Sequence, residues 1–192
     1  FGIMITASHN PYHDNGVKLF NKNGYKLDII SRQKIENLIF SEKLGESLAE
    51  PSKLGRAKRL DDAPGRYIEF VKRSFPKNFT LSGLKIVLDC ANGSAYNLAP
   101  TILWELGAEV TKLSCEPNGF NINDNCGSIY PENLCKKVLE TKSDIGIALD
   151  GDADRITICN EKGQVIPGEY IIAMIATYLK THRRLKGDAI VV

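Results

Sequence analysis

Three aspartates at alternate positions form the clearest chemical motif in this sequence. Asp150, Asp152 and Asp154 occur in Asp-Gly-Asp-Ala-Asp-Arg, directly after the apolar, strand-like segment 145–149. Carboxylate oxygens at this spacing, in a turn that Gly151 permits, suit a hard cation such as Mg²⁺ rather than zinc. Without a cation, three carboxylates at the end of a buried strand repel one another. The motif therefore predicts a magnesium site, and a solvated acidic turn is the alternative.

An EF-hand calcium loop also has acidic residues at alternate positions, but it fits this segment poorly. Arg155 occupies the position at which that loop requires glycine. In addition, a strand-like segment rather than a helix comes before Asp150. We therefore prefer the magnesium interpretation.

A second polar loop begins at Thr6 and contains a possible nucleophile. In Thr-Ala-Ser-His-Asn-Pro, residues 6–11, the hydroxyl of Ser8 is next to the imidazole of His9, and Pro11 stiffens the loop. Serine and histidine that are neighbours in sequence do not by themselves form a nucleophile–base pair, so an ordinary turn remains the alternative. The sequence has no G-x-S-x-G elbow, which argues against an α/β-hydrolase serine.

Both loops follow strand-like segments, and the elements around them alternate between strand and helix patterns. We expect a helix from Ser31, with that residue as its N-cap, and further helices at 64–75, 95–106, 131–140 and 168–180. The expected strands are 2–6, 17–20, 84–89, 108–113, 145–149, 156–159 and 164–166, the last two paired around the turn 161–163.

This alternation predicts an α/β fold with mixed, mostly parallel sheets and helices on both faces. The composition changes near residues 76–78. We expect one α/β domain at 78–192, preceded at 1–77 by the rear part of another domain. Both ends of the sequence are apolar and strand-like, which favours a segment of a longer protein.

The composition indicates a globular chain and sets limits on its partners. The 192 residues are 43% hydrophobic and 25% charged, with a formal net charge of +2, which gives no reason to expect nucleic acid or a membrane surface as a partner. Five cysteines form no C-x-x-C pair, and no apolar stretch approaches the ~20 residues of a membrane helix. These features, with no signal peptide pattern, favour the cytosol.

Taken together, the two loops resemble those of the α-D-phosphohexomutase superfamily. The matching residues are Thr-Ala-Ser-His-Asn-Pro, the segment Asp14-Asn15-Gly16-Val17-Lys18, and the aspartate loop about 140 residues further on. The segment 118–128 is most similar to the corresponding segment of bacterial phosphoglucosamine mutases. The resemblance covers essentially the whole chain and implies phosphohexomutase-type repeated domains, of which this chain has the rear of the first and the second.

The resemblance implies a cytosolic enzyme that interconverts glucosamine 6-phosphate and glucosamine 1-phosphate on the route to UDP-N-acetylglucosamine. In such enzymes a phosphoserine, here Ser8, donates its phosphoryl group to the hexosamine phosphate and recovers the opposite phosphate from the bisphosphate. The implied ligands of Mg²⁺ are an oxygen of that phosphoserine and the carboxylates of Asp150, Asp152 and Asp154. No other cofactor is implied.

The resemblance also implies roles for four further residues. Lys18 matches the general acid/base, and Arg155 matches a cation in the phosphate region. His9 and Asn10 lie beside the nucleophile and are expected to orient it, or to hold the loop itself. The sugar-recognition and distal phosphate-binding loops of the family belong to later domains, which this chain lacks, so the chain by itself is expected to be inactive.

Three alternatives remain open at this point. Ala153 occupies a position that is usually glycine in bacterial phosphoglucosamine mutases, and alanine there is typical of phosphomannomutase and phosphoglucomutase relatives. A non-catalytic cation-binding module is a second alternative, although Ser8, Lys18 and all three aspartates are retained. The third is a phosphotransferase of the haloacid-dehalogenase type, which usually has Asp-x-Asp after an early strand rather than late in the chain.

Overall fold

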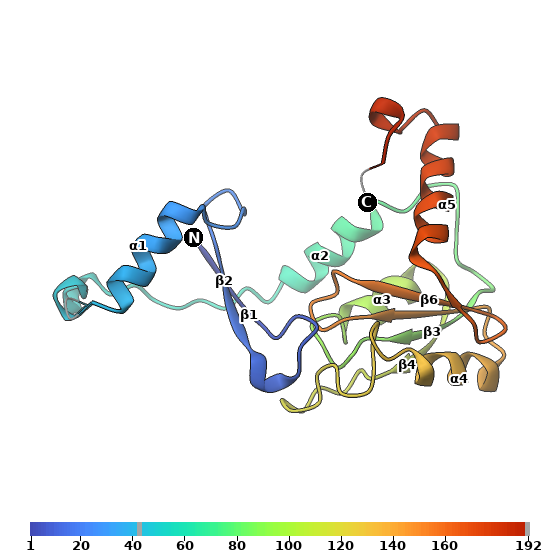
Figure 1. The fold of residues 1–192 in the computed structure, drawn as a ribbon, viewed down its shortest axis with the longest axis horizontal. Coiled ribbons are helices and arrows are strands. Elements are labelled where there is room, and N and C mark those ends of the chain that lie inside the picture. Colours follow the sequence, from blue (N-terminus) through green and yellow to red (C-terminus); the bar gives the residue numbers. More distant parts are fainter. Residues whose placement is uncertain (42–43, 191–192) are drawn as a thin grey trace. The chain divides into compact units, whose positions relative to one another are not determined.

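A computed structural model describes residues 1–41 and 44–190 of the chain (Figure 1). The chain forms two compact units, and each is discontinuous in sequence. The first comprises Phe1–Thr6 and Gly16–Arg66, and the second comprises Ala7–Asn15 and Tyr67–Val192. The loop that contains Ser8 therefore belongs to the second unit, although the strands on either side of it belong to the first.

The first unit is built on an antiparallel pair of strands. β1 (Gly2–Thr6) pairs with β2 (Gly16–Phe20) in a register that places Met4 opposite Lys18. The helix α1 (Ile29–Ile39) follows, and then two short 3₁₀ turns, Leu44–Ser47 and Pro51–Lys53. The helix α2 (Ala63–Lys72) begins in this unit and continues into the second.

The N-cap of α1 differs from the prediction. Asp28, not Ser31, caps the helix, and its carboxylate accepts hydrogen bonds from the backbone N–H of Ser31 at 2.8 Å and from the Ser31 hydroxyl at 2.9 Å. A carboxylate is as good an N-cap acceptor as a serine hydroxyl and also benefits from the helix dipole. The helix therefore begins at Ile29, and Ser31 lies within its first turn.

The second unit contains a mixed five-stranded sheet with strand order β4-β3-β5-β6-β7. Parallel pairing joins β3 to both β4 and β5, and antiparallel pairing joins β6 to β5 and β7. The mixed sheet and the hairpin between β6 and β7 confirm the prediction, but the sheet is less parallel than expected, because two of its four strand pairings are antiparallel. The strands are β3 (Lys85–Asp89), β4 (Glu109–Leu113), β5 (Ile145–Leu149), β6 (Ile156–Asn160) and β7 (Val165–Ile166).

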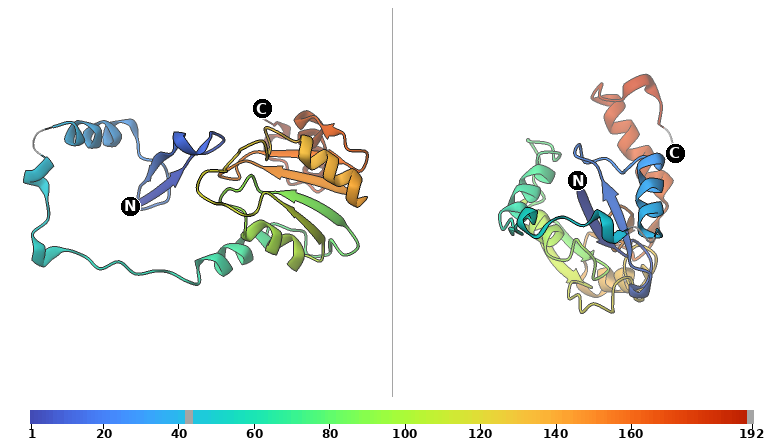
Figure 2. Two further views of the ribbon diagram at one scale, coloured as in Figure 1. Left: turned by 90° about the horizontal axis from the view of Figure 1, so that it is seen from below. Right: turned by 90° about the vertical axis from the view of Figure 1, so that its left-hand side faces the viewer.

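Helices cover both faces of this sheet. Alternate side chains of β3 point to opposite faces, as a strand requires: Val87 packs with Leu134 and Val138 of α4 (Glu132–Thr141), while Leu88 packs on the other face toward α3 (Leu98–Glu105). Figure 2 shows α3 and α4 on opposite sides of the strands. The predicted helices on both faces are confirmed.

The helix α3 begins three residues later than the pattern predicts. The backbone before it is held by other contacts, because the N–H of Ser94 donates to the Gly151 carbonyl at 2.8 Å and the N–H of Tyr96 donates to the Gly93 carbonyl at 3.2 Å. The last helix is α5 (Gly168–Thr181). Among the described residues, no helix has the length and apolar character needed to cross a membrane.

Candidate functional site

The aspartate loop lies at the carboxyl end of β5, and its three carboxylates converge. Asp150, Asp152 and Asp154 each offer an oxygen within 4.8 Å of the others. Exposure increases along the loop, since Asp150 is fully buried, Asp152 is half-buried and Asp154 is exposed. The structure therefore brings the three predicted ligands into one cluster that opens toward solvent.

Asp150 has one buried oxygen that finds no hydrogen-bond partner among the described residues. Its Oδ1 accepts from the backbone N–H groups of Asp154 at 3.1 Å and Arg155 at 3.0 Å, whereas Oδ2 is buried and unpaired. Burial raises the pKa of Asp150, and the charges of Asp154 and Asp152 raise it further, against the lowering effect of the two backbone hydrogen bonds.

An unpaired buried carboxylate oxygen is costly, because it has lost water without gaining a donor. A cation bound by the cluster would replace that water and offset the mutual repulsion of the carboxylates. The donors are all oxygens, which suits a hard divalent cation. The residues present therefore fit a metal ion of that class.

Ser8 lies against this cluster within the second unit. Its hydroxyl donates to Oδ1 of Asp152 at 3.3 Å and lies 3.4 Å from Nδ1 of His9. Ser8 has a positive φ of 54°, and the turn that holds it is closed by a 2.9 Å hydrogen bond from the N–H of Asn10 to the carbonyl of Ala7. A residue 144 positions away in sequence thus contacts the candidate nucleophile.

Asn123 fixes the serine loop in place, and the sequence analysis missed this residue. Its Nδ2 donates to the carbonyl of Ser8 at 2.9 Å and to the carbonyl of Asn10 at 2.8 Å. Its own backbone N–H donates to the carbonyl of Ala91 at 2.9 Å, and the residue is buried. Asn123 therefore ties the serine loop, through its side chain, to the loop after β3, through its backbone.

Two glycines allow these loops to approach one another. A Cβ on Gly151 would collide with the carbonyl oxygen of Ser8, and a Cβ on Gly93 would collide with the carbonyl oxygen of Gly151. Neither residue needs a positive φ, so close approach of backbones is the constraint. Gly93 and Gly151 are signals in the sequence that could have indicated a tight junction of loops here.

The segment 121–128, whose role the sequence does not reveal, is fastened to the carboxyl edge of the sheet. Buried Asp89, the last residue of β3, accepts from the N–H of Ala91 at 2.9 Å and of Gly127 at 3.0 Å. The N–H of Ser128 donates to the carbonyl of Leu149 at 3.0 Å. The role of the segment 121–128 is thus partly structural, because the segment presents Asn123 to the serine loop.

The other predicted site residues lie outside the aspartate cluster. Arg155 is exposed and directly follows the cluster. His9 lines a cavity of about 340 Å³ together with Tyr12 and Phe120. Lys18 lies in β2 of the first unit, so its predicted role remains a prediction. Glu161 is at the twelfth position counted from Asp150, as in an EF-hand loop, but β6 intervenes, and among the described residues the cluster consists of the three aspartates.

Comparison with known families finds matches over most of the chain. Residues 65–163 match the family described as phosphoglucomutase/phosphomannomutase, alpha/beta/alpha domain II, and residues 1–46 match alpha/beta/alpha domain I of the same description.

Individual relatives match almost the full length of the chain. It is 56% identical over 190 residues to the phosphoglucosamine mutase of Zymomonas mobilis and 55% identical over 190 residues to that of Granulibacter bethesdensis. These alignments cover 99% of this chain but 42% and 41% of the relatives. The chain therefore spans about two fifths of the length of the curated relatives that it matches.

A solved structure has a similar fold. A phosphoglucomutase/phosphomannomutase family protein from Burkholderia thailandensis aligns with a TM-score of 0.72 at 28% identity. The alignment covers 94% of this chain and 38% of that protein.

Proposed function

Because this chain belongs to the phosphoglucomutase/phosphomannomutase family, we propose that it is part of a phosphoglucosamine mutase. The whole enzyme interconverts glucosamine 6-phosphate and glucosamine 1-phosphate through a phosphoserine and a bisphosphate intermediate. The similarity to phosphoglucosamine mutases along almost the entire chain supports hexosamine phosphate as the substrate class.

One observation carries this proposal. The hydroxyl of Ser8 lies within hydrogen-bonding distance of Asp152, and Asp152 belongs to the cluster of carboxylates. A nucleophile next to a cation site is the arrangement that phosphoryl transfer requires, because the transferred group carries negative charge that must be offset. A purely structural acidic turn does not need a hydroxyl at this place.

Asp150, Asp152 and Asp154 hold Mg²⁺ in this proposal, and an oxygen of phosphorylated Ser8 completes the protein's share of the ligands. When bound, the ion supplies positive charge next to the transferred phosphoryl group. Asp152 and His9 orient the Ser8 oxygen, and Asn123 fixes the backbone on both sides of His9.

In the transfer step, the bond between phosphorus and the Ser8 oxygen breaks, and a bond forms between phosphorus and a hydroxyl oxygen of the sugar phosphate. The hydroxyl proton passes to Lys18, the proposed general acid/base, and a proton returns to the Ser8 oxygen. The reverse transfer, from the other end of the bisphosphate, regenerates the phosphoserine. Arg155 attracts the phosphate groups, and Asn10 keeps the loop in its turn.

We further propose that residues 1–77 are the rear of the first domain of the enzyme and that residues 78–192 are its second domain. The parts of the enzyme that hold the sugar and its distal phosphate lie outside this chain, so this chain alone is inactive. The cytoplasm is the proposed location, in agreement with five free cysteines.

The test uses the full-length enzyme that contains this chain. It is incubated with glucose 1,6-bisphosphate and Mg²⁺, and phosphate on Ser8 is measured by intact mass and peptide mapping. We expect one phosphate, absent in Ser8→Ala and reduced in Asp152→Asn. Ser74→Ala is the matched control, because the exposed Ser74 hydroxyl contacts only the Val71 carbonyl among the described residues. An enzyme that converts substrate without ever carrying phosphate on Ser8 would contradict the mechanism.

The substrate is tested separately, because Ala153 also fits phosphomannomutase and phosphoglucomutase relatives. The rates with glucosamine 6-phosphate, mannose 6-phosphate and glucose 6-phosphate are compared at equal concentration. A higher kcat/KM for the glucosamine compound supports the proposal. A preference for mannose or glucose phosphate would assign the chain to the other branch while leaving the phosphoserine mechanism intact.

A further inference from the structure

Two cysteines meet at the carboxyl end of the parallel strands β3 and β4. Cys90 directly follows β3, and its backbone N–H donates to the carbonyl of Leu113 at 3.1 Å. The thiol of Cys115 donates to the same carbonyl, also at 3.1 Å. Both residues pack in the same core cluster, and the thiol of Cys90 donates to the carbonyl of Ala95 at 3.7 Å. The shared acceptor places the backbone of Cys90 and the thiol of Cys115 side by side, as a disulfide between them requires.

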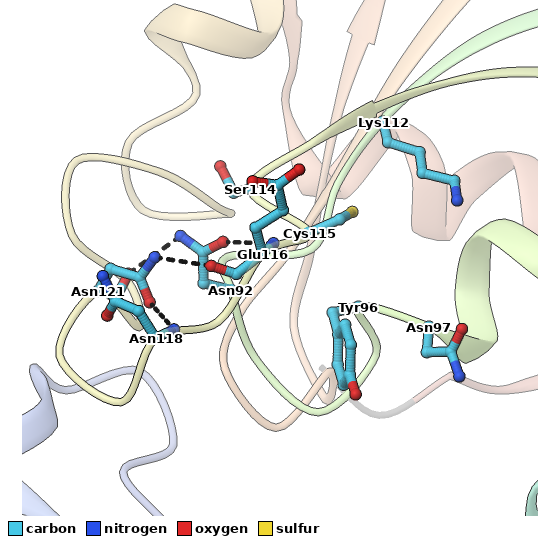
Figure 3. Close-up of a pocket in the computed structure, with 9 residues that line it drawn as sticks. All are labelled: Asn92, Tyr96, Asn97, Lys112, Ser114, Cys115, Glu116, Asn118 and Asn121. Atoms are coloured by element: carbon cyan, nitrogen blue, oxygen red, sulfur yellow. Dashed lines mark hydrogen bonds between the residues drawn. The ribbon is translucent and has the colours of Figure 1, made fainter.

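The two thiols differ in their access to solvent. Cys90 is fully buried, whereas Cys115 is half-buried and lines a cavity of about 670 Å³ together with Lys112 (Figure 3). The neighbouring thiol of Cys90 lowers the pKa of Cys115, and the neighbouring thiol of Cys115 together with burial raises the pKa of Cys90. Because the thiolate is the nucleophile in exchange reactions, Cys115 is the thiol that reacts first.

The loop after Cys90 is in contact with the aspartate loop. The N–H of Ser94 donates to the carbonyl of Gly151 at 2.8 Å, and Gly93 leaves no room for even a Cβ against that carbonyl. The carbonyl of Ala91 accepts from Asn123, which holds the serine loop. The backbone that follows Cys90 is thus connected, within four residues, to the loop that carries the candidate metal ligands.

We propose that Cys115 is a thiol-exchange site for low-molecular-weight disulfides, that Cys90 is its resolving partner, and that the disulfide between them weakens cation binding by the aspartate cluster. The second half of this inference rests on the proposed function, and the first half does not.

The chemistry balances in two steps. The Cys115 thiolate attacks a disulfide R–S–S–R, which forms Cys115–S–S–R and releases R–S⁻. The Cys90 sulfur then attacks the Cys115 sulfur, and its proton passes to the departing R–S⁻. The protein loses two hydrogen atoms, and the reagent becomes two thiols. An added dithiol reduces the disulfide between Cys90 and Cys115 again.

A second pair of neighbouring cysteines in the chain serves as an internal control. Cys135 of α4 packs against the core cluster that contains Cys159 of β6, and burial together with the neighbouring Cys135 thiol raises the pKa of Cys159 to about 12. Cys135 is half-buried, as Cys115 is, but it does not line the 670 Å³ cavity. Burial also raises the pKa of the remaining cysteine, Cys126, to about 11. Contact between thiols alone should therefore be insufficient for reaction.

The experiment treats the folded chain with 2-hydroxyethyl disulfide, blocks the remaining thiols with iodoacetamide, and maps the products by mass spectrometry. Digestion after glutamate cleaves at Glu116 and Glu132, which separates Cys115, Cys126 and Cys135 from one another. The variants are Cys115→Ser, Cys90→Ala and, as the matched control, Cys135→Ser. The Mg²⁺ affinity is measured by calorimetry before oxidation, after it, and after reduction with dithiothreitol.

We expect a Cys90–Cys115 disulfide in the wild type and in Cys135→Ser, none in Cys115→Ser, and a stable mixed disulfide on Cys115 in Cys90→Ala. The Mg²⁺ affinity should fall several-fold on oxidation and recover on reduction. Oxidation of Cys135–Cys159 at an equal rate, or no reaction at Cys115, would overturn the exchange site. A disulfide that leaves Mg²⁺ affinity unchanged would overturn the coupling. If the reduced chain binds no Mg²⁺, the proposed metal site fails while the exchange site stands.

Discussion

Asp150→Asn is the substitution that tests the electrostatics of the aspartate cluster most directly. The asparagine carbonyl can keep both hydrogen bonds that Oδ1 accepts from the backbone N–H groups of Asp154 and Arg155. The change therefore removes one negative charge and one proposed metal ligand while it leaves the turn in place. We expect the variant to be more stable than the wild type without metal and less stable with it.

The size of the effect follows from the spacing of the carboxylates. Two unit charges 4.8 Å apart repel by about 3.5 kcal/mol at an effective dielectric constant of about 20. Solvent at the exposed Asp154 screens part of this repulsion, and the new Nδ2 group must find an acceptor. We therefore expect a metal-free gain of about 1–2 kcal/mol. The wild type should gain about 2.7 kcal/mol at a Mg²⁺ concentration 100 times the Kd, and the variant should gain almost nothing.

The assay is thermal unfolding of the folded chain in EDTA and across a Mg²⁺ titration. For a unit of this size, 1 kcal/mol corresponds to roughly 3–5 °C in Tm. Glu109→Gln is the control, because it removes one exposed carboxylate at the opposite end of the sheet from the cluster. If Asp150→Asn responds to Mg²⁺ as the wild type does, Asp150 is not a ligand. If its metal-free Tm does not exceed that of the control, the repulsion argument is wrong.

Three further predictions concern the same unit. The folded-state pKa of Asp150 is raised, so the metal-free chain should lose stability as the pH rises from the ordinary aspartate range through that pKa. Tm measured from about pH 4 upward should show this loss in the wild type but not in Asp150→Asn. Asn123→Gly keeps the positive φ of 56° but removes two hydrogen bonds to the serine loop, so amide exchange of residues 7–15 should become about 10- to 100-fold faster. Asn123→Ala should lower the free energy of unfolding by about 1 kcal/mol more than Asn123→Gly does, because alanine is strained at positive φ. Unchanged exchange would mean that Asn123 does not hold the loop. Leu134→Ala empties a fully buried position in the core and should lower the free energy of unfolding in urea by about 2–5 kcal/mol, whereas a loss below 1 kcal/mol would show that this core is loosely packed.

The periodicity of the sequence predicts the sheet and its helices well, because each strand and helix has its own local pattern. The run 84–89 is apolar on both faces, as a central strand covered by α3 and α4 must be. The first residues of helices were harder to predict. Asp28 and Ser31 are both good N-caps, and only the backbone path of the chain decides between them.

The site itself was predictable where its residues are adjacent in sequence and unpredictable where they are not. The three aspartates converge because one turn holds them. The clamp of Asn123 on Ser8 joins residues 115 positions apart, and no local pattern indicates it. The segment 121–128 does contain Asn123 and Asn125 at positive φ, and its high asparagine content is typical of left-handed backbone, but it does not indicate what the loop holds.

The discontinuity of the two units has a consequence for the order of events during synthesis. Ser8 leaves the ribosome before its partners Asn123 and Asp152, which follow 115 and 144 residues later. At 5–20 residues per second, the wait for Asp152 lasts about 7–30 s. Throughout that time β1 and β2 can pair, because their contact is local, while the serine loop between them has nothing to bind. The loop of Ser8, the proposed nucleophile, is thus made before the residues that hold it, and the proposed site is complete only after the aspartate loop has been made.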